Sequence, residues 1–125
     1  MREIKFRAKI KNPHVDEWVY GYLVSECYIN EKNKLGYTPV RKETVGQYTG
    51  LHDKNGKEIY EGDILQIDIE RAWVMWNEKY GYFELVPIGD YYFDSPVIGE
   101  AIEYIDSEVI GNIYENEDLL NETNR

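Results

Sequence analysis

Three carboxylates fall within one short segment of the chain, at Glu58, Glu61 and Asp63. Hard divalent cations bind carboxylate oxygens, so a metal site is the first chemistry to consider. The segment lacks the Asp-x-Asp-x-Asp-Gly spacing of a calcium loop. Gly62 and Asp63 also have a sufficient structural role, because glycine accepts a positive φ and aspartate binds backbone N–H groups within a turn. We therefore expect no metal site here.

The two histidines, His14 and His52, both lie beside turn residues. A catalytic histidine needs a nucleophile or a carboxylate within hydrogen-bond reach. Ser25, Cys27 and Asp53 are available, but no nucleophile motif surrounds them. Cys27 stands between apolar residues, which is typical of a half-buried thiol, and a single cysteine excludes an internal disulfide. The sequence therefore predicts no catalytic residues.

Gly50, Gly56 and Gly62 could suggest a loop that cradles a phosphate. However, no glycine-rich run opens a predicted helix, and the neighbouring charges are largely acidic. These glycines are interpreted as turn residues. We accordingly expect no cofactor and no enzymatic activity.

Aromatic side chains form the second group that could bind a partner. Aromatic rings stack nucleic-acid bases where cations rim the site, and here only Arg71 and Lys79 stand near the later cluster. Tyr and Trp are also enriched in protein interfaces. We therefore favour roles in the core and in an interface for these aromatic residues. The candidate interaction surface consists of Trp18, Tyr20, Tyr22, Trp73, Trp76, Tyr80 and Tyr82.

The chain is acidic, with a formal net charge of −10 over 125 residues. Such a charge repels nucleic acids and anionic membranes. One local exception is a basic face of the first predicted strand, formed by Lys5, Arg7, Lys9 and Lys11. Charged residues interrupt any apolar run at the start, and no stretch is long enough to span a bilayer. We expect no membrane association and a cytoplasmic location.

Alternation with a period of two predicts a strand at the start of the chain. Ile4, Phe6, Ala8 and Ile10 should face a core, and residues 17–24 should return as the second strand of a hairpin over 2–24. A polar loop is expected over 30–44. Strands at short intervals then predict a core over about 45–114, and the whole chain reads as one mainly β domain, 1–125.

The sequence also predicts two local features, a hairpin turn and a short helix. Asn55-Gly56 predicts a two-residue type I′ hairpin, because that turn needs a positive φ at both central residues. Asn116 is a good N-cap for a short helix over 116–121, whose first turn carries Glu117 and Asp118.

Four segments of the chain form one recognisable set: Tyr48–Leu51, Asp53–Ile64, Met1–Arg7 and Val109–Asn116. Together they resemble the YopX family, small proteins of bacteriophages and prophages with no established biochemical activity. The chain departs from the family pattern at 25–44, where the spacing is loose, and at Glu117, where Pro is common. The residues of the signature turns are Tyr48, Thr49, Gly50, Leu51, Asp53, Asn55, Gly56, Gly62 and Asp63. The resemblance implies an SH3-like small barrel and phage origin, and it supplies no catalytic residues.

The favoured function is that of a non-enzymatic phage or prophage accessory protein acting through protein–protein contacts in the cytoplasm of a bacterial host cell. A small barrel with an added N-terminal hairpin cannot bury all its aromatics, so we expect a homo-oligomer. A host or phage protein is a further expected partner. The alternative is a nucleic-acid-associated protein that uses the basic face, or an acidic mimic of DNA.

Overall fold

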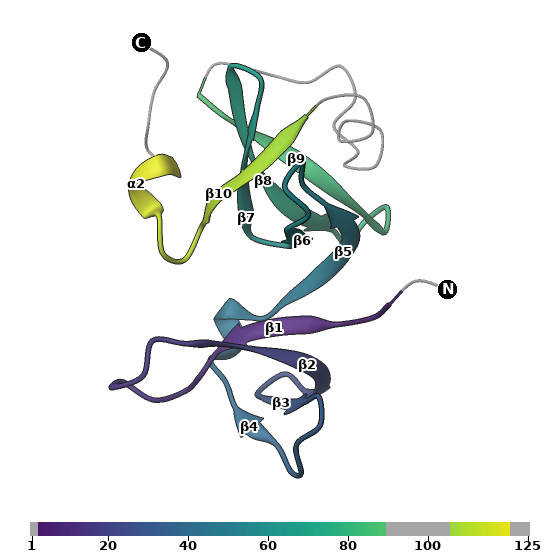
Figure 1. Ribbon diagram of the computed structural model, residues 1–125, viewed down its shortest axis with the longest axis vertical. Helices are drawn as coiled ribbons and strands as arrows, with labels where there is room; N and C mark the ends of the chain where they lie inside the picture. Colours follow the sequence, from purple (N-terminus) through teal and green to yellow (C-terminus); the bar gives the residue numbers. More distant parts are fainter. Residues whose placement is uncertain (1–2, 90–105, 121–125) are drawn as a thin grey trace. The chain divides into compact units, whose positions relative to one another are not determined.

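The computed structural model describes residues 3–89 and 106–120 (Figure 1). Nearly all the regular structure in these residues is β-strand, which confirms a mainly β fold. The chain divides into two compact units, Met1–Gly50 and Leu51–Arg125. The organisation as one domain over 1–125 stays a prediction.

The first unit is built on an antiparallel sheet. Its elements are β1 (Phe6–Lys9), β2 (Trp18–Ser25), β3 (Tyr28–Glu31), β4 (Thr38–Pro39), a 3₁₀ turn η1 (Lys42–Thr44) and the start of β5 (Gly46–His52). The strands lie in the order β4-β3-β2-β1-β5, and β1 and β2 form a hairpin in which Lys9 lies opposite Trp18. Strand β5 carries the chain into the second unit.

One face of this sheet buries an apolar core. Ala8, Val19, Ile29 and Val40 are buried there. Phe6 and Ile10 pack against them, as the alternation along the first strand predicts, whereas Ile4 is exposed. Ile4 precedes β1, so the alternation of the strand does not fix its direction.

The segment 30–44, expected to be a polar loop, contains the end of β3, all of β4 and η1. Two residues between β3 and β4 have left-handed backbones, Asn33 with a φ of +65° and Gly36 with a φ of +81°. Asn and Gly tolerate this conformation best, so the turn residues suit the backbone. The segment is therefore a hairpin with a shaped loop.

The second unit contains another antiparallel sheet. Its further elements are β6 (Glu58–Tyr60), β7 (Asp63–Ile67), β8 (Glu70–Asn77), β9 (Tyr82–Ile88), β10 (Ser107–Asn112) and α2 (Glu117–Leu120). Four strands lie in the order β10-β7-β8-β9, and β6 belongs to the sheet that contains β5. Over residues 3–89 and 106–120 neither sheet closes on itself, so the structure does not confirm an SH3-like barrel.

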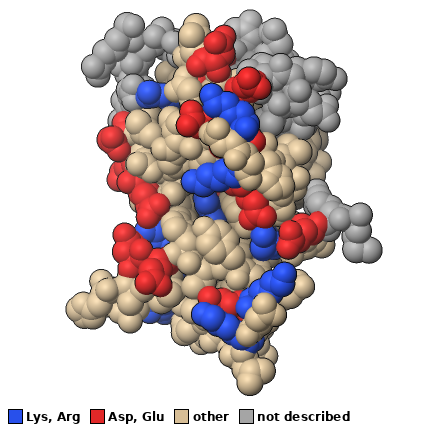
Figure 2. All heavy atoms as spheres, in the orientation of Figure 1, with Lys and Arg blue, Asp and Glu red and all other residues tan. Residues whose placement is uncertain are grey.

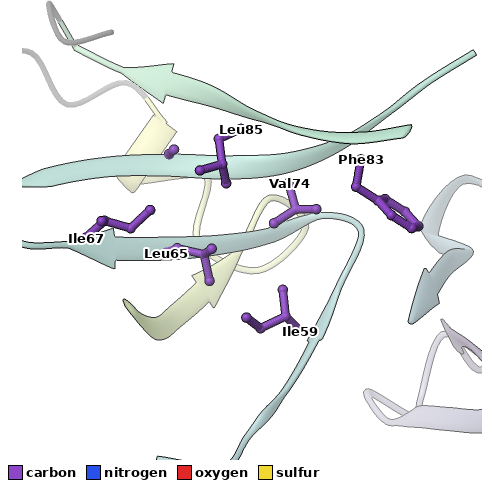
Figure 3. Close-up of a cluster of buried hydrophobic side chains, with 7 residues drawn as sticks. Ile59, Leu65, Ile67, Val74, Phe83 and Leu85 are labelled. Atoms are coloured by element: carbon purple, nitrogen blue, oxygen red, sulfur yellow. The ribbon is translucent and has the colours of Figure 1, made fainter. Parts of the chain in front are cut away.

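The core of the second unit gathers side chains from β6, β7, β8 and β9 (Figure 3). The register places Val74 opposite Leu85 on neighbouring strands, so the two side chains share a face. Ile59, Leu65 and Val74 have no exposed surface. Burying an aliphatic side chain of this size stabilises a fold by about 1.5–3 kcal/mol.

The turn between β5 and β6 differs from the predicted type I′ hairpin. Gly56 has a φ of +82°, but Asn55 does not have a positive φ, and type I′ requires both. The Gly56 N–H donates to the Asp53 carbonyl at 3.0 Å, and the Asp53 N–H donates to the Lys57 carbonyl at 2.8 Å. Residues 54–56 thus form a three-residue loop that ends in a left-handed glycine. The type I′ prediction was wrong because it ignored the Asp53 side chain.

The last described element is the short helix α2. The Leu119 N–H donates to the Asn116 carbonyl at 2.9 Å, so Asn116 does precede the helix. Its side-chain oxygen, however, accepts from the Asn112 N–H at 3.1 Å, which joins it to the end of β10. Within the described residues, no helix has the length and apolar character needed to cross a membrane.

Candidate functional site

The outer face of the first sheet carries exposed tyrosines. Val19 on β2 points into the core, so Trp18, Tyr20 and Tyr22 point to the opposite face. Tyr22 lies opposite Asn30, and Tyr28, two residues earlier on β3, shares that side. Trp18 is half-buried, whereas the tyrosines are exposed, Tyr22 to 65%. We call Tyr20, Tyr22 and Tyr28 the tyrosine face.

The basic side chains of β1 lie on the same side of the sheet, with Arg7 opposite Tyr20 and Lys9 opposite Trp18. Arg7 and Lys9 are each only 5% exposed. The Arg7 guanidinium carbon lies 4.5 Å from the centre of the Trp18 ring, and the Lys9 ammonium lies 5.4 Å from it. Lys9 also forms an ion pair with Asp16. The charges of Arg7 and Lys9 are therefore engaged by the Trp18 ring and by Asp16 of the same chain.

The remaining two cations of the predicted basic face are arranged differently. The Lys5 ammonium lies 5.3 Å from the centre of the Tyr48 ring and 3.7 Å from a carboxylate oxygen of Glu3. Lys11 is exposed beyond the end of β1. The four cations therefore do not form a shared exposed surface, because aromatic rings and carboxylates engage three of them.

A small groove adjoins the tyrosine face. Its volume is about 80 Å³. Pockets for small-molecule substrates have about 300–1,000 Å³, so this groove has room for a side chain rather than for a substrate. It is lined by Glu3, Ile4, Lys5, Gly21, Tyr22 and Lys32.

The later aromatic residues of the predicted surface lie in the second unit. Trp76 lies opposite Phe83, and their rings meet edge to face with centres 4.9 Å apart. The Tyr80 and Tyr82 rings stack at 6.0 Å. Trp73 and Trp76 are three residues apart on β8, so they point to opposite faces of the sheet. The seven predicted residues thus form separate groups.

Asp53, one of the signature residues, accepts hydrogen bonds from two parts of the second unit. One carboxylate oxygen accepts from the N–H groups of Asn55 and Lys57, each at 2.9 Å. The other accepts from the Val109 N–H on β10, also at 2.9 Å. Burial by itself raises the pKa of Asp53, but these three hydrogen bonds and the Lys57 charge lower it below the ordinary 3.8 overall. Asp53 therefore joins the turn to β10 as a carboxylate.

A second buried carboxylate shapes the next turn. Asp63 is almost fully buried and accepts from the Tyr60 N–H at 2.7 Å. Gly62 before it has a φ of +94°, and a Cβ atom there would lie 3.0 Å from the Tyr114 ring. The Glu58 carboxylate accepts from the Tyr60 hydroxyl at 2.9 Å. Two of the three carboxylates considered for a metal thus accept hydrogen bonds from Tyr60.

The other residues considered for chemistry lie apart. His14 and His52 are exposed, and Cys27 is half-buried beside Ser25. In the part of the chain that the structure describes, no three His, Cys, Asp or Glu residues group in a way that could hold a metal ion. The geometry gives these residues no shared site.

Two features of the structure were not predicted from the sequence. One is the bond from Asp53 to Val109, which spans 56 residues and has no local signal, although the Asp-x-Asn-Gly pattern could have indicated the turn. The other is the loop between β3 and β4, where Leu35 is fully exposed. An apolar residue within a polar stretch was the available signal.

The comparisons with known proteins place the chain in one family. No curated protein matches the chain. The family model described as "YopX protein" matches residues 5–121, which is nearly the whole chain. The protein belongs to the YopX family.

Proposed function

We propose that this YopX protein is a non-enzymatic accessory protein of a phage or prophage. It acts in the cytoplasm of a bacterial host through protein–protein contacts, including contacts with further copies of itself. The observation that supports this most strongly is the tyrosine face, where Tyr20, Tyr22 and Tyr28 are all exposed. Tyrosine covers a large contact area at a low entropic cost and keeps a polar tip in water when unbound.

The absence of catalysis is part of the proposal. The described carboxylates with the greatest burial, Asp53 and Asp63, accept hydrogen bonds from the backbone. The groove beside Tyr22 is too small for a substrate. An SH3-like barrel completed by the whole second unit also stays a proposal, supported by the β-rich antiparallel sheet.

The nucleic-acid alternative receives less support. Arg7 and Lys9 stack on Trp18, so they are not available to phosphates. Figure 2 shows acidic and basic side chains interspersed on the face in view, rather than gathered into a single-sign surface. A DNA mimic needs an extended run of negative charge.

Light scattering after size exclusion tests the proposal. The wild-type protein should have a mass above the monomer value of 14.8 kDa that rises with concentration. The double substitution Tyr20→Lys with Tyr28→Lys should lower this mass, because it places charge on the tyrosine face. Tyr80→Lys changes an exposed tyrosine of the second unit and serves as the matched control. A wild-type monomer at every concentration would contradict self-association.

A further inference from the structure

The loop between β3 and β4 is held in a defined shape. The Asn30 side-chain amide donates to the carbonyls of Gly36 at 2.6 Å and of Lys34 at 3.4 Å. The Thr38 hydroxyl donates to the Glu31 carboxylate at 2.8 Å, and the Lys34 ammonium lies 3.3 Å from the same carboxylate. These bonds close the loop at its base.

This shaped loop exposes apolar side chains. Leu35 is fully exposed, and Tyr37 is 65% exposed. A partner that binds a preformed loop loses less conformational entropy on binding. We call Leu35 at this loop the knob.

The groove beside Tyr22 is of a size to receive the knob. Its volume of about 80 Å³ is roughly half that of an engineered cavity that holds benzene, about 150 Å³, so one branched aliphatic side chain fits. Ile4 and Tyr22 give it apolar walls. Lys32 lines the groove and also belongs to the loop, so groove and knob lie near one another on the first unit. Since Leu35 is fully exposed, it does not fill the groove of its own chain.

We propose that the groove is occupied by Leu35 of a second copy of this chain. The proposal rests on the proposed function and names the contact that brings copies together. Because each copy carries both knob and groove, two copies related by a two-fold axis make the contact twice. Tyr22, which belongs to the tyrosine face and lines the groove, makes the two surfaces continuous.

The charges around the contact favour this arrangement. The groove and the loop together carry three lysines, Lys5, Lys32 and Lys34, and two glutamates, Glu3 and Glu31. The net charge of these five residues is +1, although the net charge of the chain is −10. Two copies that meet here avoid the repulsion of their acidic surfaces. Lys34 next to the knob would approach Glu3 at the rim of the groove of the other copy, which gives charge complementarity.

Sedimentation equilibrium of the full chain tests the contact. Leu35→Ser should raise the dissociation constant of the dimer at least about 100-fold, because the side chain is lost from both contacts. Ile4→Asp should weaken the dimer from the groove side. Both residues are exposed, so neither substitution removes core packing. Ile69→Ser, at an exposed apolar residue of the second unit, is the matched control and should leave the constant unchanged.

Removal of the two charges sharpens the test. Lys34→Gln and Glu3→Gln place no like charge beside Glu31 or Lys5, and each should weaken the dimer by about 3- to 10-fold, since each ion pair forms twice. The double variant should be no weaker than either single variant, because both substitutions remove the same ion pair. If wild-type dimers form and neither Leu35→Ser nor Ile4→Asp weakens them, the knob contact is wrong while self-association stands. A wild-type chain that stays monomeric overturns both.

Discussion

The two units use buried charged side chains in different ways. In the second unit, Asp53 and Asp63 accept hydrogen bonds from backbone N–H groups and fix the turns around them. In the first unit, Arg7 and Lys9 stack on the ring of Trp18. Asp53 and Asp63, which belong to the family signature, therefore stabilise the turns of the fold. The exposed apolar residues that could bind a partner lie mostly elsewhere.

The family match covers both units. The family model spans residues 5–121, which include the loop between β3 and β4 as well as the turns of the second unit. The contrast between the units therefore lies in their side-chain contacts.

Removing the Asp53 carboxylate should have the largest effect on stability. Asp53→Ala leaves the N–H groups of Asn55, Lys57 and Val109 without their acceptor, and hydrogen bonds to a charged group contribute about 1.5–3 kcal/mol each. Because such contributions are not additive, we expect a loss of about 3 kcal/mol in the free energy of unfolding. Urea denaturation of Asp53→Ala, with Asp53→Asn as the conservative control, measures it. If Asp53→Ala lost less unfolding free energy than Asp53→Asn, the role assigned to the Asp53 carboxylate would be contradicted.

Gly62→Ala should come next, with a cost of about 2 kcal/mol from the left-handed backbone and the Tyr114 contact together. Gly56→Ala is the matched control, because Gly56 also has a positive φ but a Cβ there would meet no atom within 4 Å. Its cost should be about 1 kcal/mol. Equal costs in thermal unfolding would show that the Tyr114 ring moves away without penalty.

Acid should remove part of the contribution of Asp53. Its pKa in the folded protein lies below the ordinary 3.8, so the stability it contributes is fully present above that value. It is lost as the pH falls through the lower pKa of the folded state. The difference in unfolding free energy between wild type and Asp53→Asn should therefore shrink at acid pH. A difference that grows as the pH falls would contradict the assigned hydrogen bonds.

The sequence predicted what depends on local pattern. The alternation of Phe6, Ala8 and Ile10 placed one face of β1 correctly against a core. It failed for Arg7 and Lys9, because their burial depends on Trp18, which joins them only through the pairing of two strands. The expected exposed basic face was therefore not formed.

In the candidate site, too, features set by local pattern were predicted and features set by tertiary structure were not. Tyr20 and Tyr22 were predicted from spacing on one strand, and both are exposed. Trp73 and Trp76 were grouped by nearness in sequence, although the pleat of β8 sends them to opposite faces. The groove could not be predicted, because its walls come from residues on three separate segments.

Disulfide trapping between copies tests the central claim most directly. In a Cys27→Ser background, Ile4→Cys protein is mixed with Leu35→Cys protein under oxidising conditions. A disulfide needs Cα atoms within about 7 Å, so only a knob seated in a groove holds the two thiols close enough to link efficiently. We predict a linked dimer in much higher yield than from Ile4→Cys mixed with Ile69→Cys. Equal yields from the two mixtures would contradict the account.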